Sequence, residues 1–191
     1  MHPERWILAG TLLLSACGND APVEESRKAR VQAKSGAVWG RDLAAGLGLQ
    51  TWELCAELGV YDCIDDAHRI TLGGVEPTEL GIDKPLEDAS VSAPIAVERV
   101  AQAACGERLS RDQAGQPVVF GPVLDRNSRR NRKKVSEQLI VRLLNRHPTD
   151  EEVDGLVDLY DTIEPLTDQP VRDWAIGACV VVSTSTEALF Y

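Results

Sequence analysis

Three aspartates and a histidine lie within seven consecutive residues, and their side chains are the best suited to chemistry in this chain. Carboxylates beside an imidazole can hold a divalent cation, or can supply the acid and the base of a proton transfer. The same residues also suit a polar turn, in which aspartates cap a short helix and the histidine is partly buried. The alternating acids, central glycine and terminal glutamate of an EF-hand loop are absent. This group, which we call the acidic turn, consists of Asp62, Asp65, Asp66 and His68.

Six cations lie within nine residues in the second half of the chain. The whole chain carries a net charge of −10, from 20 Lys and Arg against 30 Asp and Glu, so without these six the charge would be −16. Such a concentrated positive field can contact anionic headgroups or an acidic protein, with each cation contributing about 1 kcal/mol near an anionic surface. The alternative is a solvated helix start whose cations pair with carboxylates of the same chain. This group, the basic segment, consists of Arg126, Arg129, Arg130, Arg132, Lys133 and Lys134.

A short uncharged apolar stretch at residues 6–14 follows a polar amino terminus. Nine helical residues at about 1.5 Å each cannot cross a hydrocarbon core of about 30 Å. The pattern is therefore typical of a signal peptide. It leads into Leu14-Ser15-Ala16-Cys17, which resembles the lipobox of bacterial lipoproteins.

The lipobox resemblance implies that residues 1–16 are removed, that Cys17 carries a diacylglyceryl group and that its new amine is acylated. Two or more acyl chains make attachment to a membrane stable. Inner-membrane retention is commonly signalled by Asp directly after the lipidated cysteine, and here that position is Gly18. We therefore expect an exported protein anchored in the outer membrane, and the sequence leaves open whether it faces the periplasm or the outside.

Four cysteines remain once Cys17 is set aside, an even number in an oxidising compartment. They are Cys55, Cys63, Cys105 and Cys179, and they allow three pairings. A bridge between Cys55 and Cys63 is local and easy to close. Cys105 would then pair with Cys179, and by closing a long loop this second bridge would stabilise the fold by about 4 to 5 kcal/mol. Free thiols or a metal site are the alternatives, although the chain has no C-x-x-C pair. We predict two disulfides.

Charge and missing motifs exclude several classes of function. A net charge of −10 argues against binding to nucleic acid, which requires a basic face. The chain contains no G-x-S-x-G, no G-x-x-x-x-G-K-[ST] and no H-E-x-x-H, so it lacks the signatures of serine hydrolases, P-loop proteins and zincins. It also has no C-x-x-C-H for covalent haem attachment. The sequence thus indicates no catalytic residue, no metal and no cofactor.

The elements that position these groups should form a mostly α-helical domain. We divide the chain into a lipoprotein signal peptide (1–16), a lipidated cysteine with a flexible tether (17–36), and a single helical domain (37–191). The domain is expected to have about five helices, one long irregular loop at residues 59–93, at most a minor strand pair, and disulfides that staple it.

Apolar spacing and capping residues predict where the helices lie. One spans residues 38–58 with a bend near 46–48, one begins at Pro94, and one spans 128–146. A fourth begins with a capping box at residues 149–152, and the last begins at Pro170. Within the irregular loop only residues 68–72 resemble a strand. Core packing is predicted for four aromatic side chains: Trp39, Trp52, Phe120 and Trp174.

Residues 143–152 (LLNRHPTDEE) and 185–191 (STEALFY), with Leu156, Leu159 and Tyr160 between them, provide a second resemblance. They are similar to helical segments of large secreted planctomycete and myxobacterial proteins associated with cytochrome-type domains. The function of those segments is itself unassigned. The resemblance implies a helical exported domain, without the haem motif of the larger proteins.

Three functional hypotheses follow. The first is a lipid-anchored envelope protein that acts as an interaction or assembly module, with a protein partner or an anionic envelope surface. The second is an enzyme or a cation-binding protein that uses the acidic turn. The third is an accessory subunit of an exported redox complex.

Overall fold

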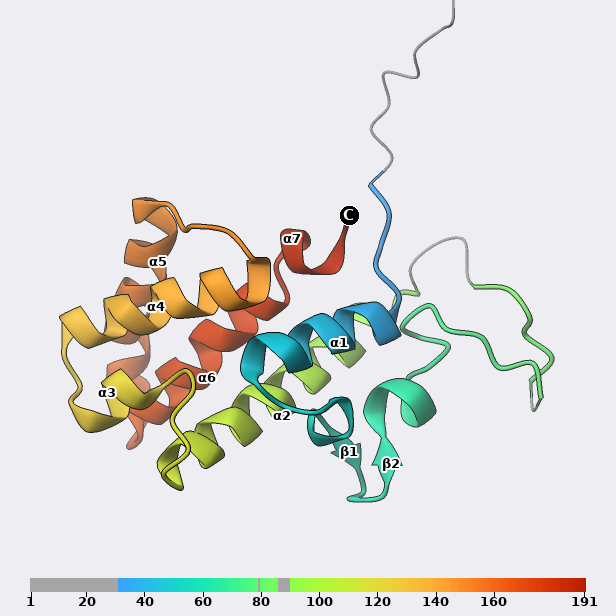
Figure 1. Ribbon diagram of the computed structural model, residues 1–191, viewed down its shortest axis with the longest axis horizontal. Coiled ribbons are helices and arrows are strands. Elements are labelled where there is room, and N and C mark those ends of the chain that lie inside the picture. The colour runs from blue at the N-terminus through green and yellow to red at the C-terminus, as the bar shows by residue number, and fades with distance from the viewer. Residues whose placement is uncertain (1–30, 79, 86–89) are drawn as a thin grey trace, which may run out of the picture. The chain divides into compact units, whose positions relative to one another are not determined.

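The computed structural model describes residues 31–78, 80–85 and 90–191 (Figure 1). The described part is mostly helical with a two-stranded antiparallel sheet, which confirms the predicted fold class. The lipobox, the signal peptide and most of the tether lie outside these residues. In chain order the elements are α1 (Gly36–Leu47), η1 (Thr51–Glu53), β1 (Ala56–Glu57), β2 (Tyr61–Asp62), η2 (Cys63–Ala67), α2 (Ala93–Gln113), α3 (Gly121–Asp125), α4 (Arg129–Leu144), α5 (Asp150–Ile163), η3 (Glu164–Leu166), α6 (Pro170–Ser183) and α7 (Thr186–Leu189).

Helices α2 and α6 pack against each other in the centre of the fold and are joined by the disulfide Cys105–Cys179 (Figure 1). Both cysteines are fully buried. Trp174 on α6 is also buried, and its indole Nε1 donates a hydrogen bond to the carbonyl oxygen of Leu156 on α5 at 2.8 Å. The covalent link therefore runs through the hydrophobic core, where the two helices already contact each other.

Helix α1 ends at Leu47, well before the end expected from apolar spacing. Gly48 adopts a left-handed conformation (φ 64°), which closes the helix because glycine has no Cβ to clash there. The prediction of one helix over residues 38–58 is therefore wrong. The same turn changes the direction of the chain, so Trp52 is 68% exposed and its predicted place in the core is wrong as well.

The other aromatic residues and the other helix starts follow the predictions. Trp39, Phe120 and Trp174 are buried. Thr149 and Glu152 form the predicted capping box at the start of α5, and each accepts a hydrogen bond from the backbone amide of the other. These starts were accessible to sequence analysis because capping depends on neighbouring residues only.

The loop predicted at residues 59–93 contains β2 and η2 near its start, and its described residues from there to α2 are irregular. Residues 68–72 form turns instead of a strand. The amide of Gly36 donates to the carbonyl oxygen of Leu72 at 2.7 Å. A Cβ at Gly36 would lie 2.6 Å from the Cβ of Leu72, so only glycine permits this approach. The contact fixes the irregular segment to the start of α1.

A buried ion pair holds the connection between α2 and α3. The guanidinium of Arg108 lies 2.8 Å from the carboxylate of Asp112, and both side chains are almost completely buried. Asp112 also accepts hydrogen bonds from the backbone amides of Val118, Val119 and Phe120 at 2.5 to 3.0 Å. The carboxylate therefore holds the loop at residues 118–120 against the end of α2.

The compact unit begins at Val31, a few residues before the expected start of the domain. The backbone amide of Lys34 donates to Leu189, and that of Tyr191 donates to Gln32. The last residues of the expected tether thus pair with the carboxyl-terminal residues.

Candidate functional site

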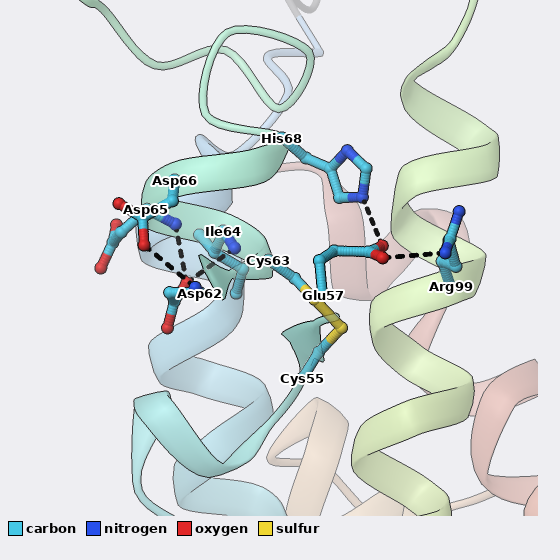
Figure 2. Close-up of a disulfide and its surroundings, with 9 residues drawn as sticks. All are labelled: Cys55, Glu57, Asp62, Cys63, Ile64, Asp65, Asp66, His68 and Arg99. Carbon is cyan, nitrogen blue, oxygen red and sulfur yellow. Dashed lines mark hydrogen bonds and ion pairs between the residues drawn. A yellow bond between two sulfur atoms is a disulfide. The ribbon is translucent and has the colours of Figure 1, made fainter. Parts of the chain in front are cut away.

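A disulfide-closed hairpin carries the acidic turn (Figure 2). Strands β1 and β2 pair in antiparallel register, with Ala56 opposite Asp62 and Glu57 opposite Tyr61. The disulfide Cys55–Cys63 closes the base of the hairpin, and with Cys105–Cys179 it gives the two predicted bridges. The π-helical turn η2 follows immediately, so the hairpin and the acidic turn form one small structural unit.

Two of the three aspartates of the acidic turn, Asp62 and Asp66, cap the backbone. Oδ1 of Asp62 accepts hydrogen bonds from the amides of Ile64 and Asp65, both at 2.7 Å. Oδ2 of Asp66 accepts one from the amide of Asp62 at 3.0 Å. This is the polar-turn arrangement that the sequence offered as an alternative to a cation site.

His68 points away from the aspartates and toward the other end of the hairpin (Figure 2). Its Nε2 lies 3.3 Å from Oε1 of Glu57, and Oε2 of the same carboxylate accepts a hydrogen bond from Arg99 of α2 at 2.9 Å. The structure therefore does not bring the imidazole and the aspartates to one point. It instead joins His68 to Glu57 and Arg99, a set that the sequence analysis did not find because their spacing spans a hairpin and a separate helix.

Within the described residues one group has the donors and spacing of a metal site: Cys55, Glu57 and Cys63. Both sulfur atoms belong to the disulfide, and metal ions bind the thiolate form. In its disulfide form the hairpin does not offer this group as a set of ligands.

The loop of the hairpin presents apolar side chains to solvent. Leu58 is 88% exposed, Val60 76% and Tyr61 55%. Leu58 also has a positive φ of 54°, followed by Gly59 at 72°. We call these three residues, Leu58, Val60 and Tyr61, the hairpin tip. The sequence analysis missed them because it places Leu58 at the end of a helix and Val60 and Tyr61 in the irregular loop at residues 59–93, with Gly59 as the only local signal of a turn.

Half of the basic segment pairs with groups of the same chain. Arg129 lies 2.8 Å from a carboxylate oxygen of Asp158, and this hydrogen bond raises the pKa of the guanidinium above its ordinary value. Lys133 lies 3.9 Å from Asp150. The guanidinium of Arg132 stacks on the ring of Tyr160 at 3.9 Å. These contacts fasten α4 to the acidic face of α5, as the alternative interpretation of the segment expected.

The remaining three cations of the basic segment are exposed, and they form no ion pair with any residue that the structure describes. They are Arg126, Arg130 and Lys134. Carboxylates thus neutralise two of the six cations, Arg129 and Lys133, at close range.

Two hollows lie elsewhere on the molecule. A cavity of about 570 Å³ lies where residues 32–36, the carboxyl-terminal residues and the start of α2 meet. An open groove of about 620 Å³ runs between α2, α5 and α6. No residue of the acidic turn or the basic segment lines either of them.

In the part of the chain that the structure covers, we find no helix with the length and apolar character needed to cross a bilayer. Comparison with known protein families, curated proteins and solved structures found no match to this chain.

Proposed function

We propose that this chain is an exported, lipid-anchored protein of the bacterial cell envelope that acts as an interaction or assembly module. The observation that carries the proposal is the pairing of all four cysteines after Cys17 into two disulfides. Such pairing is typical of proteins that fold in an oxidising compartment. It agrees with the lipobox at residues 14–17, which would use the fifth cysteine as the attachment point.

Two exposed surfaces support the role in interaction. The hairpin tip presents apolar side chains that nothing in the described structure covers. The unpaired cations Arg126, Arg130 and Lys134 suit contact with phosphate groups of an anionic envelope surface. The acidic turn supports this role less directly, because the carboxylates of Asp62 and Asp66 cap the backbone.

Metabolic labelling with palmitate tests the anchor. We expect the parent chain to incorporate label and to fractionate with membranes, and Cys17→Ser to lose both properties. Gly18→Asp is the matched control, because it leaves the lipidated cysteine intact and should keep the label while the chain moves to the inner membrane. An unlabelled parent that stays with membranes as well as Cys17→Ser does would contradict the proposal.

Binding of the Cys17→Ser chain to vesicles that contain phosphatidylglycerol tests the basic segment. Replacing the three unpaired cations, Arg126, Arg130 and Lys134, by serine should weaken binding about a hundredfold, since each cation contributes about 1 kcal/mol near an anionic surface. Arg129→Ser should weaken it less, because that side chain already pairs with Asp158. An equal loss of affinity per cation removed would mean that the ion pair with Asp158 does not reduce the contribution of Arg129 to vesicle binding.

A further inference from the structure

The hairpin tip is an unusual place for large apolar side chains. Single exposed apolar residues are common on protein surfaces, but neighbouring ones at a projecting loop often mark a binding surface. Leu58 and Val60 lie in the loop between β1 and β2, Tyr61 begins β2, and each of the three is more than half exposed. Because these side chains are largely exposed, they bury little apolar area on folding, and their apolar surface remains available for a partner.

Leu58 adopts a backbone conformation that a leucine disfavours. Its φ of 54° is in the left-handed region, where glycine, asparagine and aspartate are the usual residues. The positive φ of Leu58 and Gly59 forms the turn that lets β1 and β2 pair, but the leucine side chain itself adds little to the fold because it is almost wholly in solvent. Residues held in such conformations gather at binding sites and active sites.

The hairpin tip is also held rigidly. The disulfide Cys55–Cys63 closes its base, and the carboxylate of Glu57 is fixed between His68 and Arg99 (Figure 2). A loop already held in one conformation loses less entropy when it binds. This rigidity favours the tip as an anchor for docking.

The charge around the hairpin selects the kind of partner. Asp62 follows Tyr61 in β2, Asp65 and Asp66 lie in η2 next to the base of the hairpin, and no ion pair joins any of the three to another described residue. Three unneutralised carboxylates repel an anionic lipid surface and attract a surface that carries lysine or arginine.

We infer that the hairpin tip is a docking surface for a protein partner, which receives Leu58, Val60 and Tyr61 in an apolar pocket whose rim carries Lys or Arg side chains. The inference rests on the proposed function, for which it names the contact surface and the class of partner.

Site-specific photo-crosslinking of the full chain in its native envelope is the first step of the test. A photoreactive residue at position 58 should crosslink to a protein, and one at position 166 should not, although Leu166 is similarly exposed. The crosslinked protein is then purified and titrated with the full chain and its variants, because capture alone does not establish a specific contact.

Two variants give the quantitative expectation. Leu58→Asn keeps a residue that tolerates the left-handed region but removes the apolar side chain. It should weaken binding at least tenfold without lowering the urea midpoint of unfolding. The double variant Asp65→Asn, Asp66→Asn should weaken binding several-fold and reduce its dependence on salt. Leu166→Asn, the matched control, should bind like the parent.

Each contrary outcome has a distinct meaning. Crosslinks from position 166, or from a third photoreactive residue placed at the exposed position 130 of the basic segment, but not from 58 would overturn the docking surface and leave the proposed function standing. The absence of a crosslink from all three positions would contradict the proposed function itself. Unchanged affinity of Leu58→Asn, or vesicle binding by the Cys17→Ser chain that Leu58→Asn abolishes, would overturn the assignment to a protein partner.

Discussion

At the scale of single residues, Leu58 gives the clearest conflict between local conformation and side chain. Glycine at this position removes the clash of Cβ with the backbone, which costs an L-residue about 1 to 2 kcal/mol in the left-handed region. Part of that gain is offset by the extra entropy of glycine in the unfolded chain. We expect Leu58→Gly to raise the free energy of unfolding by up to about 1 kcal/mol, measured by urea denaturation.

Val60→Gly is the control for this change, since Val60 is also exposed but has no positive φ. It should lower the free energy of unfolding slightly, by up to about 1 kcal/mol. If Leu58→Gly lowers the free energy of unfolding as much as Val60→Gly does, the leucine is not strained by its positive φ.

Asp112 is the residue whose loss should matter most for folding. Asp112→Ala leaves the charge of Arg108 buried without its partner and leaves three backbone amides without their acceptor. We expect a loss of about 3 to 5 kcal/mol in the free energy of unfolding, measured by urea denaturation. Glu107→Ala is the matched control, since Glu107 pairs with Arg111 on the same helix but is partly exposed. Its loss should stay below about 1 kcal/mol, and equal losses would contradict the account.

These residues also mark the limit of sequence analysis. Arg108 and Asp112 have the spacing of an ordinary surface pair on a helix, and only the loop that folds back over them makes the pair buried. Trp52 was expected in the core because its spacing continues that of α1. Its exposure follows from the turn at Gly48, one residue beyond the last helical position.

At the scale of elements, Arg146 joins the end of α4 to the starts of α5 and α7. Its guanidinium hydrogen-bonds the carboxylates of Glu152 and Glu187. The hydrogen bond from Arg146, followed by that from the amide of Thr149, lowers the pKa of Glu152 to about 2. A carboxyl group with a depressed pKa stabilises the fold above its unfolded value of 4.5. That contribution is lost as the pH falls through this range toward 2.

Glu152→Gln tests this junction. The variant lacks the titrating group, so it should be less stable than the parent at pH 7, and the difference should shrink as the pH falls from about 5 to about 2. Urea denaturation at several pH values measures both curves. Parallel curves across this range would show that Glu152 has the same pKa in the folded and unfolded chain.

The two disulfides differ in the length of chain that each encloses. By the entropy of loop closure, replacing Cys105 and Cys179 by alanine should cost about 4.5 kcal/mol, and replacing Cys55 and Cys63 about 2.5 kcal/mol. Urea denaturation of the two double variants measures the difference. A larger loss of stability on removing Cys55–Cys63 than on removing Cys105–Cys179 would contradict the view that each disulfide stabilises the fold according to the length of chain it encloses.

Helix starts were predictable and the hairpin was not, for a physical reason. The capping box of Thr149 and Glu152 is complete within four residues. The register of Ala56 opposite Asp62 depends instead on the turn after α1 and on a disulfide that closes the hairpin. The acidic turn was found because its residues are neighbours in the sequence, whereas the pairing of His68 with Glu57 and Arg99 joins separate elements.

At the scale of the whole molecule, the proposal describes a helical domain stapled by two disulfides and tethered through Cys17 to an envelope membrane. Its exposed surfaces differ in chemistry: the hairpin is apolar and acidic, and the unpaired half of the basic segment is positive. A tethered domain with two such surfaces can hold a partner near the membrane that anchors it.

The intact mass of the protein extracted from its native envelope tests the central claim most directly. The account predicts a chain that begins at Cys17, with diacylglyceryl and acyl groups on that residue and the mass loss of two disulfides. Reduction in denaturant, which exposes the buried Cys105–Cys179 bridge, should restore the hydrogens of both bridges and leave the diacylglyceryl group in place, because it is held through a thioether. A chain that retains residues 1–16, or one with an unmodified thiol at Cys17, would contradict the account.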